Sequence, residues 1–123
     1  MGYRSEVAIK CEEKAYERFR EVFIKEDLFI NPDKILYDKE NQEYYIYWDW
    51  IKWYEDYEGV NAIIKVMEAL DEEHDYRPSD ELGYKFIRLG EDDDDVETRA
   101  NDWSLELCII RKIDIPEDLE EVN

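Results

Sequence analysis

The sequence YYIYWDWIKWY, residues 44–54, decides the fold prediction, because seven of its eleven residues are aromatic. Its first part alternates as a β-strand, in which one face carries Tyr44, Ile46, Trp48 and Trp50 and the other carries Tyr45, Tyr47 and Asp49. We expect the first face in the core. Aromatic residues on the second face mean that this face is either covered by the protein or offered to a partner, and the pattern allows both.

The clearest amphipathic helix follows, at residues 60–73, after a break expected at Gly59. Its apolar stripe consists of Val60, Ile63, Ile64, Met67 and Leu70. A short strand at residues 34–38 precedes the aromatic strand, and a polar turn at 39–42 joins the two as a hairpin. The middle of the chain is therefore predicted as strand, strand and helix.

Outside this middle part, residues 3–11 alternate as a half-buried strand, and residues 12–25 have the period of a helix. A polar loop at residues 74–82 leads to a fourth strand at 84–89, which ends at Gly90. The nearly apolar run 104–113 predicts a fifth, central or well-covered strand.

The predicted order is β-α-β-β-α-β-β, and its first six elements match the ferredoxin-like arrangement. We therefore expect an α+β fold: a mostly antiparallel sheet with two helices on one face, and the last strand beside the fourth as a hairpin. Residues 1–115 are expected to form a single domain, followed by a loose acidic tail at 116–123.

The net charge of −19 restricts the partners. Residues 63–123 carry most of it, with 20 acidic and 7 basic residues. Such a charge repels phosphate backbones and anionic membranes, so we expect no direct nucleic-acid or membrane partner and favour a basic protein or metal ions. Alternatively, the acids only keep a small protein soluble and monomeric. No segment is apolar enough for a signal peptide or a membrane span, which predicts a cytoplasmic protein.

No phosphate loop, zinc spacing, nucleophile elbow or dinucleotide fingerprint occurs, so neither a cofactor nor an enzyme activity is expected. His74 lies among acids, as a solvated residue would, and Cys11 and Cys108 are expected as reduced, buried thiols. An alternative is a metal-dependent enzyme that uses Glu91 to Asp95 with Glu97, although this run departs from the calcium-loop pattern. RNA stacking on Tyr45 and Tyr47 is disfavoured by the charge.

Carboxylates can instead present a field like that of DNA to a nucleic-acid-binding protein. This hypothesis requires the acids of residues 71–81 and those of residues 91–97 to fold near each other. The predicted partner-binding residues are the acids Glu91, Asp92, Asp93, Asp94, Asp95 and Glu97 and the aromatic anchors Trp48, Trp50, Trp53 and Tyr54. A homodimer that buries residues 44–54 between subunits is a further alternative.

Three segments carry a resemblance: MGYRSEVAIK at 1–10, IKWYEDYEGV at 51–60 and YKFIRLGEDDDDVETR at 84–99. In these segments the chain resembles short proteins of unassigned function encoded by bacteriophages and prophages. The resemblance implies a small phage-associated cytosolic protein and favours a host protein as the partner, such as a host defence or nucleic-acid enzyme that it inhibits. It implies no activity and no site residues.

Overall fold

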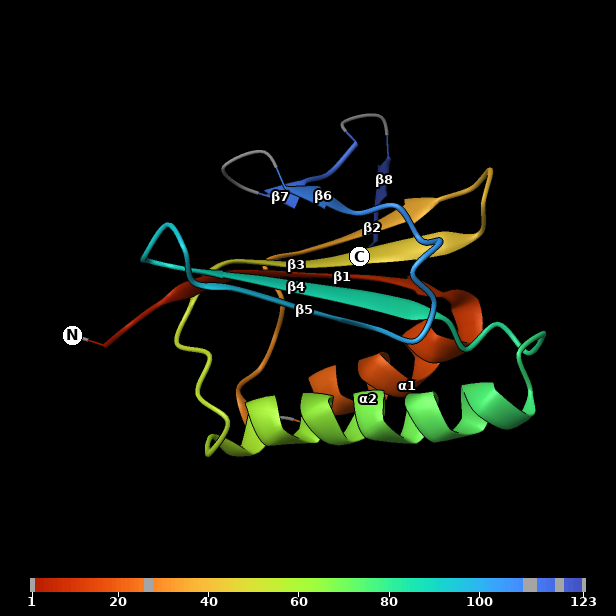
Figure 1. Ribbon diagram of the computed structural model, residues 1–123, viewed down its shortest axis with the longest axis horizontal. Coiled ribbons are helices and arrows are strands. Elements are labelled where there is room, and N and C mark those ends of the chain that lie inside the picture. The colour runs from red at the N-terminus through yellow and green to blue at the C-terminus, as the bar shows by residue number, and fades with distance from the viewer. Residues whose placement is uncertain (1, 26–27, 110–112, 117–118, 123) are drawn as a thin grey trace.

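The computed structural model describes residues 2–25, 28–109, 113–116 and 119–122. The helices are α1 (Glu13–Phe23) and α2 (Glu58–Tyr76). The strands are β1 (Ser5–Glu12), β2 (Lys34–Asp38), β3 (Glu43–Ile51), β4 (Tyr84–Gly90), β5 (Val96–Ala100), β6 (Cys108–Ile109), β7 (Ile113–Asp114) and β8 (Glu120–Glu121). Figure 1 shows three layers, with both helices on one face of the main sheet and β6 and β7 on the other.

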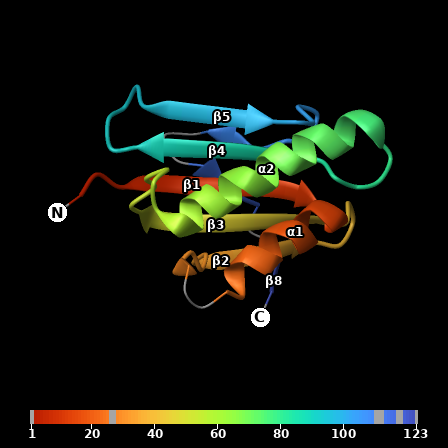
Figure 2. The same cartoon turned by 90° about the horizontal axis from the view of Figure 1, so that it is seen from below.

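The main sheet has the order β5-β4-β1-β3-β2-β8, and all its described pairs are antiparallel. Its inner order, β4-β1-β3-β2, together with the two helices, confirms the predicted α+β, ferredoxin-like arrangement. Figure 2 shows α2 crossing the sheet diagonally, and α1 beneath β3 and β2. The central strand β1 is buried from Ser5 to Cys11, so the prediction of a half-buried strand is wrong.

The helix-side core forms where the apolar stripes of the two helices meet the sheet. In α1 the buried residues include Phe19 and Phe23, and α2 buries its predicted stripe except Ile64, which is half-buried. The Trp48 indole packs edge-on against Phe23, with ring centroids 5.7 Å apart, and its Nε1–H donates to the Ile30 carbonyl at 3.2 Å. The aromatic strand is therefore the centre of the core, as predicted.

The chain's own C-terminal segment covers the second face of the sheet. There Ala8, Tyr45, Ile87 and Leu107 form a buried cluster. The Lys10 ammonium lies 5.0 Å from the centre of the Tyr45 ring and 3.3 Å from the Glu43 carboxylate. Tyr45 is thus internal and not available for stacking RNA or for a subunit contact, whereas Tyr47 is half-buried and Asp49 is exposed.

Two predictions for the C-terminal half are wrong. The strand that forms a hairpin with β4 is β5, at a polar edge, rather than residues 104–113. Within that apolar run Cys108 and Ile109 form β6 and Ile113 begins β7, which pair in the small β6-β7 sheet, and positions 110–112 lie outside the described residues. The tail is not loose at β8, which pairs with β2. Apolar composition predicted the burial of Leu105 and Leu107, but not their conformation, which is irregular rather than a strand.

The second helix is longer than predicted at both ends. It includes Gly59 in its first turn and His74 near its end, so neither the break at Gly59 nor a loop at His74 is correct. A Cβ on Gly59 would lie 2.5 Å from the Leu28 carbonyl oxygen and 2.7 Å from the Ile30 Cβ. Glycine is needed there because the segment before β2 packs against the helix backbone.

Candidate partner-binding surface

A β-bulge places Trp50 at the surface. The pairing between β1 and β3 shifts register between Ser5, which faces Ile51, and Val7, which faces Trp48. The extra residue in β3 interrupts the alternation of its side chains. Consequently Ile51 packs against the core, whereas Trp50 is 52% exposed, and the prediction of Trp50 as a core residue is wrong.

The acidic run at residues 91–95 forms the turn between β4 and β5, and the Tyr3 side chain binds it. The Tyr3 hydroxyl donates to Asp95 Oδ2 at 2.6 Å and accepts the Asp92 backbone N–H at 3.1 Å. The turn is also closed by its own backbone, because the Gly90 N–H donates to the Asp95 carbonyl at 2.9 Å. A Cβ on Gly90 would overlap both the Tyr3 hydroxyl and the Asp95 carboxylate, so this arrangement requires glycine.

The N-terminal segment also joins this turn to Trp50 and Tyr54. The Arg4 backbone N–H donates to Glu91 Oε2 at 2.6 Å, and its guanidinium donates to the Trp50 carbonyl at 3.4 Å. One residue earlier, the Tyr3 backbone N–H donates to the Tyr54 hydroxyl at 2.6 Å. Because only β1 separates β3 from β4, the end of β3 lies about 10 Å from the acidic turn, or two strand spacings.

Two of the predicted acids are held by an arginine. The Arg88 guanidinium lies 2.8 Å from Asp95 and 2.9 Å from Glu97, and its side chain is only 15% exposed. Hydrogen bonding from Arg88, with a further bond from Tyr3, lowers the pKa of Asp95 below its ordinary value. Asp95 and Glu97 therefore stabilise the hairpin, and they are not free to bind a partner as predicted.

The remaining predicted acids are at the surface. Asp92, Asp93 and Asp94 are exposed, and their carboxylates form no hydrogen bond or ion pair within the described part of the chain. We call these three residues, together with Trp50 and Glu91, the Trp50 surface. It combines an aromatic side chain with an anionic turn, which is the chemistry expected to bind a basic protein.

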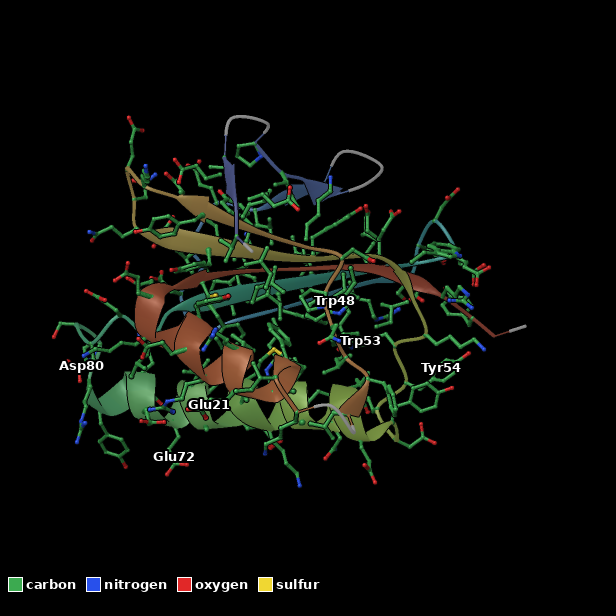
Figure 3. All side chains as sticks on the ribbon, turned by 180° about the vertical axis from the view of Figure 1, so that it is seen from behind. Glu21, Trp48, Trp53, Tyr54, Glu72 and Asp80 are labelled. Atoms are coloured by element: carbon green, nitrogen blue, oxygen red, sulfur yellow. The ribbon has the colours of Figure 1, made fainter. Side chains whose placement is uncertain are left out.

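Two of the predicted anchors are inside the protein. Trp48 is 1% exposed and Trp53 is 8% exposed, and their indole centroids lie 5.3 Å apart. Figure 3 shows both between the sheet and the helices, while Tyr54 lies toward the end where the chain begins. Trp48 and Trp53 therefore cannot contact a partner, and the hypothesis that a homodimer buries residues 44–54 loses most of its surface.

The two acidic loops lie at opposite ends of β4. This strand is seven residues long, which separates the loops by about 20 Å at roughly 3.3 Å per residue. In Figure 3, Asp80 and Glu72 lie at the end opposite Tyr54. Because charges at the surface are screened over about 8 Å at physiological salt, the loops act separately, and the predicted joint acidic surface is wrong.

Some acids at the far end are also bound internally. Asp71 lies 2.8 Å from Arg99 and accepts the Tyr84 hydroxyl at 2.8 Å. Glu73 forms two hydrogen bonds with the Arg18 guanidinium, the shorter at 2.5 Å. These contacts fasten α2 to α1 and to the sheet, so part of the charge in the second half of the chain stabilises the fold.

The alternative of a metal-dependent enzyme lacks a ligand cluster. Over residues 2–25, 28–109, 113–116 and 119–122, no group of three or more His, Cys, Asp and Glu side chains could hold a metal ion. Cys11 is a free, buried thiol, and burial raises its pKa well above the ordinary value, so it is a poor nucleophile. Placement of the Cys108 side chain lies outside the described structure.

Sequence reasoning missed the residues that assemble the Trp50 surface. Tyr3 and Arg88 look like ordinary strand residues, because their partners lie far away in the sequence or on a neighbouring strand. Comparison of the chain with protein-family models, curated proteins and solved structures gave no match. None of the helices in the described segments is both long and apolar enough to cross a membrane.

Proposed function

We propose that this protein binds the basic, nucleic-acid-binding surface of another protein through the Trp50 surface. The observation that carries the proposal is an exposed indole at the same end of the sheet as three carboxylates that have no partner within the described residues. Tryptophan is enriched among the residues that dominate binding energy at protein interfaces. Carboxylates of the turn would pair with lysine and arginine side chains that otherwise bind phosphates.

Two features of the Trp50 surface support binding without a large ordering cost. Tyr3 and Arg4 fix the acidic turn to the segment that leads into β1, through hydrogen bonds of 2.6 Å to Asp95 and Glu91. A surface that is already ordered loses less conformational entropy on association than a flexible one. The Trp50 backbone is itself part of β3, so its indole starts from a rigid strand.

Binding of this kind would block the partner's access to nucleic acid. The protein would act as an inhibitor by occupying a phosphate-binding surface, with a host defence or nucleic-acid enzyme as the partner that the phage-like segments favour. A contact dominated by exposed charges weakens as salt rises, because screening shortens the range of the attraction. The complex should therefore form at low salt and dissociate as the ionic strength increases.

The test is capture of a partner from host lysate at low and at high salt, followed by competition with duplex DNA and with RNA. We expect nucleic acid to displace the protein from its partner. The triple variant D92N/D93N/D94N should weaken the captured complex, and E68Q/E72Q/D75N is its matched control, since it removes the same charge from exposed positions of α2.

Trp50 is tested in the same assay. Trp50→Ala should weaken binding by tenfold or more, a loss of at least about 1.4 kcal/mol, as expected for an interface anchor. Trp103→Ala is the control, because Trp103 is also exposed, at 61%, but follows the opposite end of β5. A partner that binds nucleic acid and this protein simultaneously, or whose binding ignores both salt and the aspartate variant, would rule out the proposal.

A further inference from the structure

A cavity of about 550 Å³ lies between the end of β3, the first turn of α2 and the segment that precedes β2. Its walls include Leu28, Ile30, Ile51 and Val60. Figure 1 shows the orange segment before β2 running beside the start of α2, where the close approach at Gly59 allows it. Its volume falls within the range of about 300–1,000 Å³ that is usual for small-molecule sites.

Around this apolar cavity, the cationic side chains are more buried than the anionic ones. Arg4 and Lys52 are half-buried, and neither forms an ion pair with another described residue. Among the described lining residues, the acids Asp56 and Glu58 are exposed, so water screens their charges more effectively. The cationic side chains of the described lining are therefore less screened by water than the anionic ones.

The start of α2 supplies further donors to the same lining. Its N-cap residue, Tyr57, makes no side-chain capping bond, and the first intrahelical bond runs from the Asn61 N–H to the Tyr57 carbonyl. The backbone N–H groups of the first turn, at Glu58, Gly59 and Val60, precede that bond and have no partner within the helix. Such groups favour an anion, and here they adjoin two cationic side chains.

An exposed aromatic residue with a strained backbone belongs to the same lining. Phe29 is 88% exposed, and its φ of 51° lies in the left-handed region that non-glycine residues rarely adopt. Both features cost free energy in the protein without ligand. A ligand that covers the Phe29 ring would recover part of this cost.

We propose that this cavity binds a small apolar monocarboxylate, such as a medium-chain alkanoate. The alkyl chain would lie against Leu28, Ile51 and Val60, beneath the Phe29 ring. The carboxylate would bind Arg4, Lys52 and the free N–H groups of α2. This site does not depend on partner binding, although Arg4 also contacts the Trp50 surface, through its backbone N–H to Glu91 and its guanidinium to the Trp50 carbonyl.

The test compares octanoate with octan-1-ol and octylammonium, which have equal chain lengths and different charges. Calorimetric titration should give saturable octanoate binding at least tenfold tighter than that of the other two, because charge-assisted hydrogen bonds favour the anion. The amide resonances of residues 58–60 should shift on addition of octanoate. Equal affinity for the alcohol, or shifts confined to other residues, would overturn the proposal.

Two variants locate the groups that recognise the ligand. R4Q/K52Q should reduce the affinity for octanoate to that for octan-1-ol, whereas K14Q/K65Q, which removes the same charge from exposed helix positions, should leave it unchanged. An equal loss in both variants would mean that only net charge matters, and the site would be refuted. Phe29→Gly should raise the melting temperature by relieving the backbone and yet weaken octanoate binding, a combination that misfolding cannot produce.

Discussion

The Tyr3 hydroxyl donates a hydrogen bond of 2.6 Å to the Asp95 carboxylate, across 92 positions of the sequence. Tyr3→Phe removes this bond and the acceptor of the Asp92 N–H. We expect faster amide hydrogen exchange in the 91–95 turn and weaker partner binding, with exchange in β1 unchanged. Tyr76→Phe is the control, because Tyr76 is 82% exposed. Unchanged exchange at Asp92 would contradict this role of Tyr3.

Acid should weaken the same hairpin. Arg88, together with Tyr3, lowers the pKa of Asp95 in the folded protein below the unfolded value of about 3.9. Ionised Asp95 therefore adds stability that is fully present above about pH 4 and is lost as the pH falls through the folded-state pKa. In urea unfolding, the advantage of the wild type over Asp95→Asn should be present near pH 6 and shrink below about pH 4. An advantage independent of pH would refute this linkage.

Gly59→Ala should destabilise the protein, although alanine is the better helix former by about 1 kcal/mol. The added Cβ would lie 2.5 Å from the backbone oxygen of Leu28, which cannot rotate away as a side chain could. We expect a net loss of about 1–3 kcal/mol in the free energy of unfolding, measured with urea. Asn61→Ala, at an exposed position of the same helix, is the control and should be neutral or slightly stabilising.

Leu107→Ala tests whether the C-terminal segment belongs to the core. Leu107 is 4% exposed and packs in the cluster of Ala8, Tyr45 and Ile87. Its truncation should cost about 2–4 kcal/mol in urea unfolding, as for other buried leucines. Leu119→Ala should cost less, because Leu119 is only half-buried. A loss no larger for Leu107 than for Leu119 would mean that this segment covers the sheet only loosely.

Much of the fold followed from periodicity. Residues 34–38 were predicted to the residue as β2, and the apolar stripes of α1 and α2 are the surfaces that pack on the sheet. The period of the apolar residues indicates which face of an element is buried, so it predicts regular helices of several turns and strands of several residues. It failed at β5, because its sequence VETRA has the polar composition of an exposed edge.

For the candidate site, sequence composition identified the right kinds of residue but not their surroundings. Trp48 and Trp50 were expected on the core face and were also named as anchors, together with Trp53. The alternating pattern could not separate them, because a bulge of one residue cannot be read from it. The ion pairs of Arg88 were likewise hidden, since they depend on the register between β4 and β5.

The sequence by itself determined the α+β class, the order of the first six elements and the aromatic centre of the core, because local periodicity and apolar area dictate them. The tertiary structure alone decided what covers the second face of the sheet, which acids are bound by arginines and which tryptophan reaches the surface. Those features depend on contacts between residues far apart in the chain, such as Tyr3 with Asp95. They arise only when strand register and the path of the C-terminal segment bring such residues together.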